Sequence, residues 1–352
     1  MGPLPMDDIK SFVGRDSLTV SEAMQMINKN AYGILFLIDS GEKLIGCVTD
    51  GDIRRYLLGG RKMNGAALDA ANRKPRFART IEEAKHLYHQ KNYVVIPVLD
   101  ENGRVIDLYG GDPGMQRKER SPLNIPVVIN AGRGTRLDPF TRVLPKPLIP
   151  VGDLPIIELI MQEYQKYSCE EFHIIVNYKR DLMKAYFADN DRQYNIAWYD
   201  EEKPLGTGGG LSLLRGRFTD TFFFANCDAL LTANYESMLK FHKENGNTIT
   251  MICAYKNINI PYGVVEMGTN GVIEEMKEKP LISFLTNTGI YIVEPEVVDD
   301  IGDGENIGFP DIVERERQKG RKTAVFPVSE NDWMDMGQIS ELEKMRIKLY
   351  GE

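Results

Sequence analysis

The residues with the clearest chemical potential lie in one stretch, INAGRGTRLDPFTRVLPKPLIPVG, which runs from Ile129 to Gly152. It follows an apolar run, IPVV, and opens with a glycine-containing turn that bears Arg133 and Arg136. Glycines let backbone N–H groups turn toward an anion, and guanidinium groups match the oxygens of phosphates. Lys146, between two prolines, adds a point charge on a stiff segment. The stretch predicts a phosphate-binding loop; the alternative is a solvated basic loop.

This loop differs from the two commonest phosphate-binding motifs. No Gly-Lys-Ser/Thr ends it, as in a Walker loop, and the third glycine of a dinucleotide fingerprint is missing. Strand and helix patterns alternate after residue 125, which favours a mostly parallel sheet with helices on both faces. Ligands of such sheets bind beyond the carboxyl ends of the strands, and the loop follows the first strand. We therefore expect an α/β, Rossmann-like domain with its site at this loop.

Composition and charge exclude several classes of protein. The chain has 352 residues and 42% hydrophobic content, enough for two or three domains. Its formal net charge of −8 argues against nucleic acid or a membrane surface as the main partner. No apolar run is long enough to cross a bilayer, and no signal segment is recognised. The four cysteines lack the spacing of a zinc site or disulfide framework, which favours reduced thiols and a cytoplasmic location.

The first part of the chain contains a loose duplication. Residues 18–60 and 78–111 each read as a helix, a strand, a glycine-containing turn and a second strand. A repeat of this size predicts two similar units that pack as a pair, at about 7–62 and 64–115.

A polar stretch separates this repeat from the α/β part. GGDPGMQRKERSP, residues 110–122, combines charges with glycine and proline, as linkers do. The predicted domains are an α+β pair over 1–120 and the α/β domain over 123–352.

The motifs of the α/β part resemble the signature of sugar-nucleotide pyrophosphorylases, the nucleotidyltransferases that join an NTP to a sugar 1-phosphate. The loop is followed, in the family's order, by EEKPLGTGGGLSLL, NCDALLT, PYGVVE, EKP, NTGIYIVEPEV and WMDMG. The resemblance covers almost all of residues 125–352. It implies that a sugar phosphate oxygen attacks the α-phosphorus of an NTP and that pyrophosphate leaves. Such catalysis consists mainly of positioning and charge neutralisation, for which Mg²⁺ is the implied cofactor.

The resemblance also assigns roles to single residues. Arg136 would neutralise the β,γ-phosphates, and Lys146 would hold the α-phosphate or the attacking phosphate. Asp228 and Asp335 would hold the metal, with Asp228 counted among the catalytic residues. The expected nucleotide-binding residues are Ala131, Gly132, Arg133, Gly134, Thr135, Glu201, Gly206 and Thr207. The expected sugar-phosphate-binding residues are Gly263, Glu278, Lys279, Asn287 and Thr288.

Taken without the family, several of these residues have simpler interpretations. Asp228 is then a turn aspartate, Lys279 a surface lysine, and GTGGG a flexible turn. Glu201 or Glu202 would accept hydrogen bonds from guanine N1–H and N2–H₂, a donor pair that the pyrimidines lack; otherwise both acids are solvated.

The motifs resemble most the subgroup that makes GDP-sugars, whose CBS-fused members are associated with amino-sugar precursors of bacterial surface glycans. We therefore expect GTP and glucosamine 1-phosphate, with mannose or heptose 1-phosphate next.

The N-terminal repeat resembles a pair of cystathionine-β-synthase (CBS) domains. GCVTDGDIRR carries Thr49 and Asp52 at the positions where such domains hold the ribose and phosphate of an adenine nucleotide. In the second copy Gly110 and Pro113 stand at those positions. The resemblance implies regulation by a nucleotide, a homo-oligomer, or both; the alternative is a packing module without a ligand.

Two departures from the family pattern define a competing hypothesis. Asn130 and Ala131 stand at the first two places of the usual Ala-Gly-Gly, and Cys227 replaces the glycine of Asn-Gly-Asp. They support a regulatory subunit that keeps the fold, binds a nucleotide sugar and has lost turnover. The residues retained for catalysis favour an enzyme instead: Arg136, Lys146, Asp228, Lys279 and Asp335.

Overall fold

The computed structural model describes residues 2–3, 9–91, 93–111, 121–132, 134–188 and 194–351. The chain folds into two compact units, and each unit is built from more than one segment. The first unit consists of Met1–Lys118, Tyr255–Thr286 and Ser329–Asn331, and the second of Glu119–Ala254, Asn287–Val328 and Asp332–Glu352. Two segments from the later part of the chain therefore belong to the same unit as the N-terminal repeat.

The second unit is built around a seven-stranded sheet with the strand order β11-β10-β7-β12-β17-β14-β18. In chain order its strands are β7 (Val127–Ala131), β10 (Glu171–Val176), β11 (Asn195–Asp200), β12 (Phe222–Asn226), β14 (Ile249–Asn259), β17 (Leu281–Val293) and β18 (Thr323–Val328). The pairs β7–β10, β10–β11, β7–β12 and β14–β18 are parallel, whereas β12 and β17 are antiparallel. Every residue of β7 is buried, as parallel strands covered on both faces usually are. This arrangement confirms the expected α/β class.

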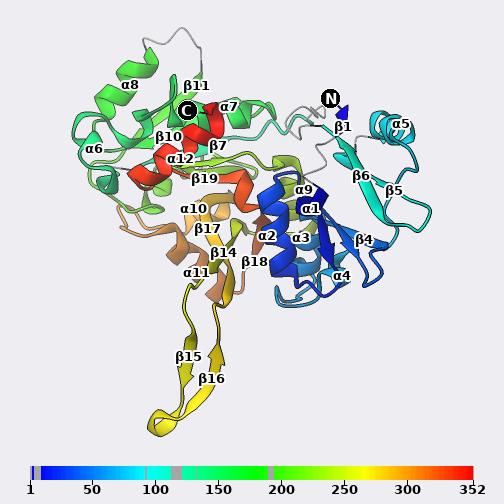
Figure 1. Ribbon diagram of the computed structural model, residues 1–352. Coiled ribbons are helices and arrows are strands. Elements are labelled where there is room, and N and C mark those ends of the chain that lie inside the picture. The colour runs from blue at the N-terminus through cyan, green and yellow to red at the C-terminus, as the bar shows by residue number, and fades with distance from the viewer. Residues whose placement is uncertain are drawn as a thin grey trace. The chain divides into compact units, whose positions relative to one another are not determined.

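Helices cover both faces of this sheet (Figure 1). The second unit contains α6 (Phe140–Val143), α7 (Ile156–Gln165), α8 (Arg180–Ala188), α9 (Tyr235–Asn245), α10 (Glu296–Asp299), α11 (Phe309–Gln318) and α12 (Ile339–Tyr350). Because side chains alternate along a strand, Phe223 of β12 joins one hydrophobic cluster, and Phe222 and Phe224 join the other. The Phe223 cluster includes residues of α7, α9 and α12, and the second cluster includes residues of α10 and α11.

Two short strand pairs complete the second unit. β8 (Pro150–Val151) pairs with β9 (Leu154–Pro155), and β13 (Ala229–Leu231) pairs with β19 (Trp333–Asp335); both pairs are antiparallel. The β13–β19 pair brings the segment after β12 against a segment from near the end of the chain.

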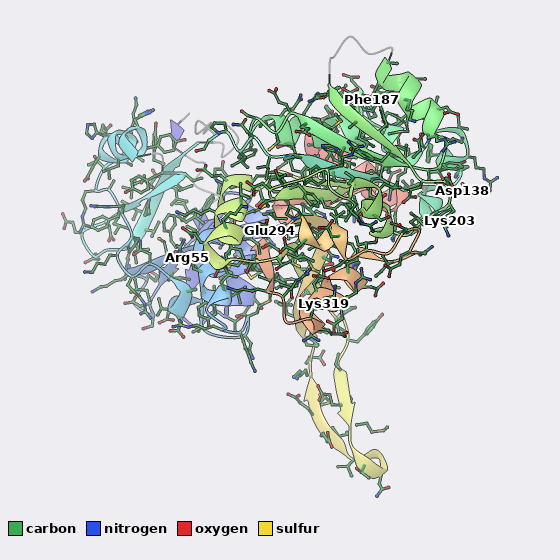
Figure 2. All side chains as sticks on the ribbon, turned by 180° about the vertical axis from the view of Figure 1, so that it is seen from behind. Arg55, Asp138, Phe187, Lys203, Glu294 and Lys319 are labelled. Carbon is green, nitrogen blue, oxygen red and sulfur yellow. The ribbon has the colours of Figure 1, made fainter. Side chains whose placement is uncertain are left out.

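A buried polar network surrounds Glu294, which follows β17 and is labelled in Figure 2. The ring of fully buried His242 hydrogen-bonds to Thr250 Oγ1 (2.8 Å) and to Glu294 Oε1 (3.0 Å). The Thr221 hydroxyl also donates to Glu294. Burial alone would raise the pKa of Glu294, but the hydrogen bonds from His242 and Thr221, together with Lys243, lower it.

The N-terminal part of the first unit contains two three-stranded sheets, β2-β3-β4 and β1-β6-β5. The first copy of the repeat comprises α1 (Ile9–Phe12), β2 (Val13–Arg15), α2 (Val20–Asn30), β3 (Ile34–Ile38), β4 (Leu44–Thr49) and α3 (Asp50–Leu58). The short helix α4 (Ala67–Ala70) follows the predicted boundary at 62–64 but packs in the hydrophobic cluster of the first copy. The second copy comprises α5 (Ile81–Lys91), β5 (Val95–Leu99) and β6 (Val105–Gly110), and β1 (Gly2–Pro3) pairs with β6. Each copy has the predicted order of helix, strand, turn and strand.

The two copies share a hydrophobic cluster. Phe36 and Cys47 of the first copy pack with Val95 and Leu108 of the second. The N–H of Leu44 also donates to the carbonyl of Gly103, which joins the two turns. Gly110 ends β6, so this strand extends into the predicted linker, and residues 112–120 of that linker lie outside the described residues.

The later segments of the first unit are attached to the first copy of the repeat. Tyr255, only 2% exposed, packs in the hydrophobic cluster that contains Val48 and Ile53. Asn28 hydrogen-bonds to Ser329 and Asn331. The segment 255–286 also contains an antiparallel hairpin of β15 (Val264–Met267) and β16 (Ile273–Lys277), drawn in yellow in Figure 1.

Candidate active site

The loop after β7 lies directly over Lys146. Gly134 has a positive φ of 71°, and a Cβ at this position would come within 2.6 Å of the Lys146 side chain. Glycine is therefore needed there both for its backbone conformation and for lack of space. By contrast, a Cβ at Gly132 would meet nothing within 4 Å. Thr135 begins the 3₁₀ helix η3 (Thr135–Leu137), and Arg133 lies outside the described residues.

Lys146 and Asp228 form a buried ion pair. Lys146 begins the 3₁₀ helix η4 (Lys146–Leu148), and Asp228 lies between β12 and β13. The Nζ of Lys146 donates to Oδ2 of Asp228, and the two residues are 6% and 9% exposed. A buried charge without a partner is costly, and in this pair each residue is the partner of the other.

Asp335 is held close to this pair by the short β13–β19 ladder. Asp335 is in register with Ala229, and the N–H of Met336 donates to the carbonyl of Asp228 (2.9 Å). Burial raises the pKa of Asp335, and the charge of Asp228 raises it further, while Lys146 and Arg136 act in the opposite direction. The structure therefore brings together four of the predicted residues, Arg136, Lys146, Asp228 and Asp335.

The two aspartates fit the expected Mg²⁺. Burial is the main cause of the raised pKa of Asp335, and the negative charge of Asp228 adds to it; a divalent cation held by both carboxylates would offset this second contribution. Mg²⁺ is commonly held by one or two carboxylates together with substrate phosphates and water. Within the described part of the chain, no group of three or more His, Cys, Asp and Glu side chains is arranged to hold a metal. A metal here would therefore depend on oxygen ligands from the phosphates.

The structure distinguishes the two acids that precede the GTGGG stretch. Glu202 is exposed, whereas Glu201, just after β11, is only 7% exposed. Burial raises the pKa of Glu201, and the N–H of Leu205 partly offsets this. Among the described residues, none donates a hydrogen bond to Oε1 of Glu201. A buried acceptor without a donor is unusual, and a ligand with N–H groups would stabilise it.

The GTGGG stretch is tightly packed, which argues against a flexible turn. Gly206 has a φ of 80°, and a Cβ there would come within 2.5 Å of the carbonyl oxygen of Ile307. The hydroxyl of Thr207 accepts from the N–H of Phe309, and its carbonyl accepts from the side chain of Asn130 (3.2 Å). The sequence alone had not indicated that Asn130 joins β7 to this stretch, since its partner is 77 residues away.

The other two residues that depart from the family pattern place their side chains in the core. Ala131 and Cys227 both belong to the hydrophobic cluster around Phe223. Burial raises the pKa of the Cys227 thiol to about 12, with a further contribution from the charge of Asp228. Cys227 is therefore a neutral packing residue. The side chains of Ala131 and Cys227 both point into the hydrophobic core.

Asn287 and Thr288 lie on β17 and are engaged within the sheet. The hydroxyl of Thr288, which is 3% exposed, donates to the carbonyl of Ile252 (2.8 Å). The amide of Asn287 donates to the hydroxyl of Tyr291 (2.6 Å) and accepts from the N–H of Gly289 (2.9 Å). Any contact of these two residues with a sugar stays a prediction.

Gly263, Glu278 and Lys279 belong to the first unit, and all three are exposed. Glu278 Oε2 lies 3.1 Å from the position that a Cβ of Gly263 would take. Lys279 has a φ of 45°, which is uncommon for a residue other than glycine and is often found at functional sites. Their binding of a sugar phosphate stays a prediction.

Thr49 and Asp52 cap the N-terminus of α3. The side chain of each accepts a hydrogen bond from the N–H of the other, and Arg55 also pairs with Asp52. Asp52 lines a cavity of about 330 Å³, together with Arg55 and Tyr56. Thr49 does not line that cavity, and the binding of an adenine nucleotide here stays a prediction.

A mostly parallel sheet with a glycine-containing loop, a buried lysine and two aspartates beyond the ends of its central strands defines a phosphate-handling α/β protein. The family model for nucleotidyl transferases matches residues 125–350, and the CBS domain model matches residues 12–59. Because the first match covers more than half of the sequence, the chain belongs to the nucleotidyl transferase family. It carries a CBS domain before that match.

Curated relatives match this part of the chain at modest identity. A UTP–glucose-1-phosphate uridylyltransferase of Synechocystis is 30% identical over 239 residues, which cover 61% of this chain and 60% of that protein. A mannose-1-phosphate guanyltransferase of Schizosaccharomyces pombe is 32% identical over 232 residues, which cover 60% of each. The chain spans about three fifths of the length of these relatives.

A solved structure supports the fold assignment. The crystal structure of HddC from Yersinia pseudotuberculosis matches with a TM-score of 0.50 and 20% identity, over 64% of this chain and 99% of that one. At this identity the likeness shows the fold alone. Across the described residues, no helix combines the length and apolar character needed to span a membrane.

Proposed function

We propose that this protein is a sugar-1-phosphate nucleotidyltransferase, which transfers a nucleoside monophosphate from an NTP to a sugar 1-phosphate and releases pyrophosphate. The observation that carries the proposal is the cluster of Lys146, Asp228 and Asp335 beside the glycine-containing loop. The cluster offers positive charge for phosphates and carboxylates for a cation at the same place. The relatives named above carry sugar-1-phosphate transferase names, which agrees with this activity.

In the proposed reaction, an oxygen of the sugar phosphate attacks the α-phosphorus, and the bond to the leaving pyrophosphate breaks. Arg136 is exposed beside Gly134, where it would neutralise the β- and γ-phosphates. Lys146 would hold the α-phosphate or the attacking phosphate, and a fixed charge in a partly dry site stabilises such a transition state strongly. Mg²⁺ held by Asp228 and Asp335 would supply further charge neutralisation.

GTP is the favoured nucleotide. Guanine presents N1–H and N2–H₂ as donors, and Glu201 offers a buried carboxylate oxygen to which no described residue donates. Uracil, thymine and cytosine do not carry this donor pair. The named relatives include both guanylyl and uridylyl transferases, so Glu201 is the feature that favours guanine.

Glucosamine 1-phosphate is the favoured acceptor, with mannose or heptose 1-phosphate next; this choice rests on the resemblance alone. The product would be a nucleotide sugar for surface glycan synthesis. We also propose that the protein is cytoplasmic, forms a homo-oligomer, and is regulated through its CBS pair, with an adenine nucleotide near Thr49 and Asp52.

The competing proposal is a nucleotide-sugar-binding regulatory subunit without turnover. Its support came from Asn130, Ala131 and Cys227. Two of these side chains pack in the core, and the third joins β7 to the GTGGG stretch, so none of them obstructs the site.

Pyrophosphate release by the full chain separates the two proposals. The four common NTPs would be combined with glucosamine, mannose, heptose and glucose 1-phosphates in the presence of Mg²⁺. We expect the highest release with GTP and glucosamine 1-phosphate. The absence of release with every pair, together with measurable binding of a nucleotide sugar, would establish the regulatory subunit instead.

A further inference from the structure

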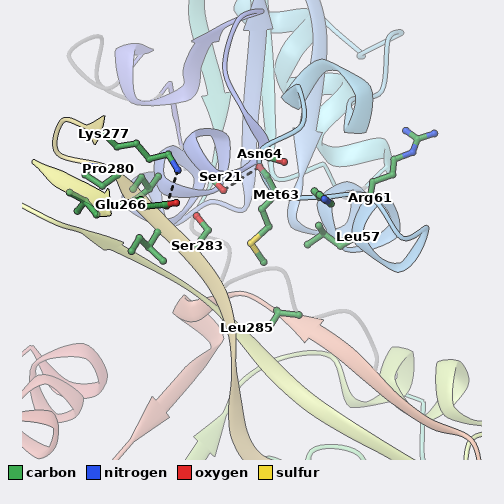
Figure 3. A pocket seen from close by; sticks show the side chains of 14 residues that line it. Ser21, Leu57, Arg61, Met63, Asn64, Glu266, Lys277, Pro280, Ser283 and Leu285 are labelled. Carbon is green, nitrogen blue, oxygen red and sulfur yellow. Dashed lines mark hydrogen bonds and ion pairs between the residues drawn. The ribbon is translucent and has the colours of Figure 1, made fainter. Parts of the chain in front are cut away.

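A cavity of about 700 Å³ in the first unit shares a residue with the predicted CBS ligand position (Figure 3). Arg61 and Lys277 are among the residues that line it. Arg61 also lines the cavity that contains Asp52, donates to the carbonyl of Asp69 (3.4 Å) and lies over the ring of Tyr56. We therefore assign this cavity no ligand of its own.

In the second unit, Asn130 and Ile175 form a floor beneath the GTGGG stretch. Asn130 of β7 and Ile175 of β10 are in register on neighbouring parallel strands, so their side chains lie on the same face of the sheet. A Cβ at Gly210 would come within 2.7 Å of the Ile175 side chain, and the amide of Asn130 donates to the carbonyl of Thr207 (3.2 Å). The stretch therefore rests on the carboxyl-terminal parts of these two strands.

Asn130 reaches the GTGGG stretch from an apolar part of the sheet. Val128, two residues earlier on β7, and Ile175 both belong to the hydrophobic cluster that contains Phe309. Asn130 is only 9% exposed, and a buried amide is costly unless it is hydrogen-bonded. Alanine, the usual residue at this place in the family pattern, has no side-chain donor. Asn130 therefore gives this chain a link between sheet and stretch that alanine could not make.

The GTGGG stretch in turn sets the position of the Glu201 side chain. The N–H of Leu205, just before the stretch, hydrogen-bonds to the Glu201 carboxyl group. Gly210, at the end of the stretch, lies so close to Oε1 of Glu201 that a Cβ there would come within 2.5 Å of it. The backbone of Glu201 is fixed separately, because its carbonyl accepts from the side chain of Asn177 (2.9 Å). A shift of the stretch would therefore change where Oε1 faces.

We propose that Asn130 is a positioning residue that sets the base preference through Glu201. By holding the Thr207 carbonyl, it keeps Oε1 of Glu201 where the N–H groups of guanine can donate to it. Asn130 acts through the stretch and does not itself contact the nucleotide. The inference rests on the proposed function, because Glu201 is the proposed contact of guanine.

Calorimetric binding of GTP and of UTP to the full chain, with Mg²⁺ present, tests the inference without turnover. In Asn130→Ala we expect the dissociation constant for GTP to rise by about three- to tenfold, the loss of roughly one hydrogen bond, and that for UTP to change by less than about twofold. Asn130→Asp keeps the size of the side chain but places an oxygen against the Thr207 carbonyl, so the preference for GTP over UTP should fall at least as much. Because alanine is the usual residue at this place, Asn130→Ala is expected to fold, and thermal unfolding checks both variants.

Two further variants separate positioning from a purely structural role. Asn245→Ala removes a comparable bond at the end of α9, from the side chain of Asn245 to the carbonyl of Phe241 (2.8 Å), and should leave the preference for GTP unchanged. In Glu201→Gln the preference is expected to be lost already, so the addition of Asn130→Ala should alter it little further. Steady-state kinetics should show the Asn130→Ala effect as a raised KM for GTP with kcat nearly unchanged.

Four results would overturn the positioning role. They are an unchanged preference in Asn130→Ala, equal losses for GTP and UTP, additive losses in the double variant, and equal binding of GTP and UTP by the intact chain. A chain that prefers GTP in binding, loses this preference in Asn130→Ala and yet shows no turnover would contradict the proposed function while leaving the positioning role in place. Turnover with a preference for GTP that does not depend on Asn130 would do the reverse.

Discussion

Lys146 and Asp228, which are 82 residues apart in the sequence, form a buried ion pair between the segments that follow the central strands β7 and β12. The pair is formed because η4 and the β12–β13 turn meet beside the glycine-containing loop. It places a fixed positive charge next to a carboxylate that the proposed metal would use. The following predictions begin from this pair.

The Lys146–Asp228 pair should serve both stability and activity, and a double-mutant cycle separates the two. Asp228→Asn leaves the Lys146 charge buried without its partner, so we expect a loss of about 3–5 kcal/mol in the free energy of unfolding. Lys146→Met/Asp228→Asn removes both charges and should regain most of that loss, while Mg²⁺-dependent turnover stays absent in both variants. Urea unfolding and pyrophosphate release measure the two effects. Full turnover by Asp228→Asn would refute the metal assignment.

Glu201 should decide which base is accepted. Glu201→Gln replaces one carboxylate oxygen by a donor, so we expect kcat/KM for GTP to fall by about 10- to 100-fold, the loss of one or two hydrogen bonds to a charged group. The values for UTP and CTP should change little. Glu202→Gln is the matched control, since Glu202 is exposed, and it should leave the preference for GTP intact. If both variants behave alike, Glu201 does not contact the base.

Gly134 should tolerate no side chain, in contrast to Gly132. Gly134→Ala would place a Cβ within 2.6 Å of the Lys146 side chain at a φ of 71°. We expect a loss of about 1–3 kcal/mol in stability, together with strongly reduced turnover. Gly132→Ala meets no atom within 4 Å, so its unfolding free energy should stay near that of the parent. Chemical unfolding of the two variants tests this, and equal stabilities would contradict the described loop.

The network around Glu294 should contribute pH-dependent stability. The folded-state pKa of Glu294 lies below its ordinary value of 4.5, so the ionised carboxylate stabilises the fold above that pH. This contribution is lost as the pH falls through the lower folded-state pKa. Urea unfolding from about pH 7 to about pH 3 should show that the stability difference between the parent and Glu294→Gln shrinks with falling pH. The exposed Glu343→Gln should show no such trend, and a constant difference for Glu294→Gln would contradict the network.

The sequence by itself determined the class of fold and the candidate loop. The strands β7 and β12 are short apolar runs, and the repeat of helix, strand, turn and strand is visible in the N-terminal part. Such patterns can be recognised within a short segment of the sequence, because a strand that is buried on both faces is apolar along its whole length. The motif order then identified the family, which the family-model match confirms.

Only the tertiary structure decided how the candidate residues are used. Glu201 and Glu202 are adjacent and identical in type, but only Glu201 is buried, where it lies against the GTGGG stretch. Ala131 and Cys227 depart from the family pattern and supported a subunit without turnover, yet their side chains pack in the core. The attachment of Tyr255 to the N-terminal repeat had no local signal either. Each of these outcomes depends on contacts between segments that are far apart in the chain. The spacing of residues along the sequence does not predict such contacts.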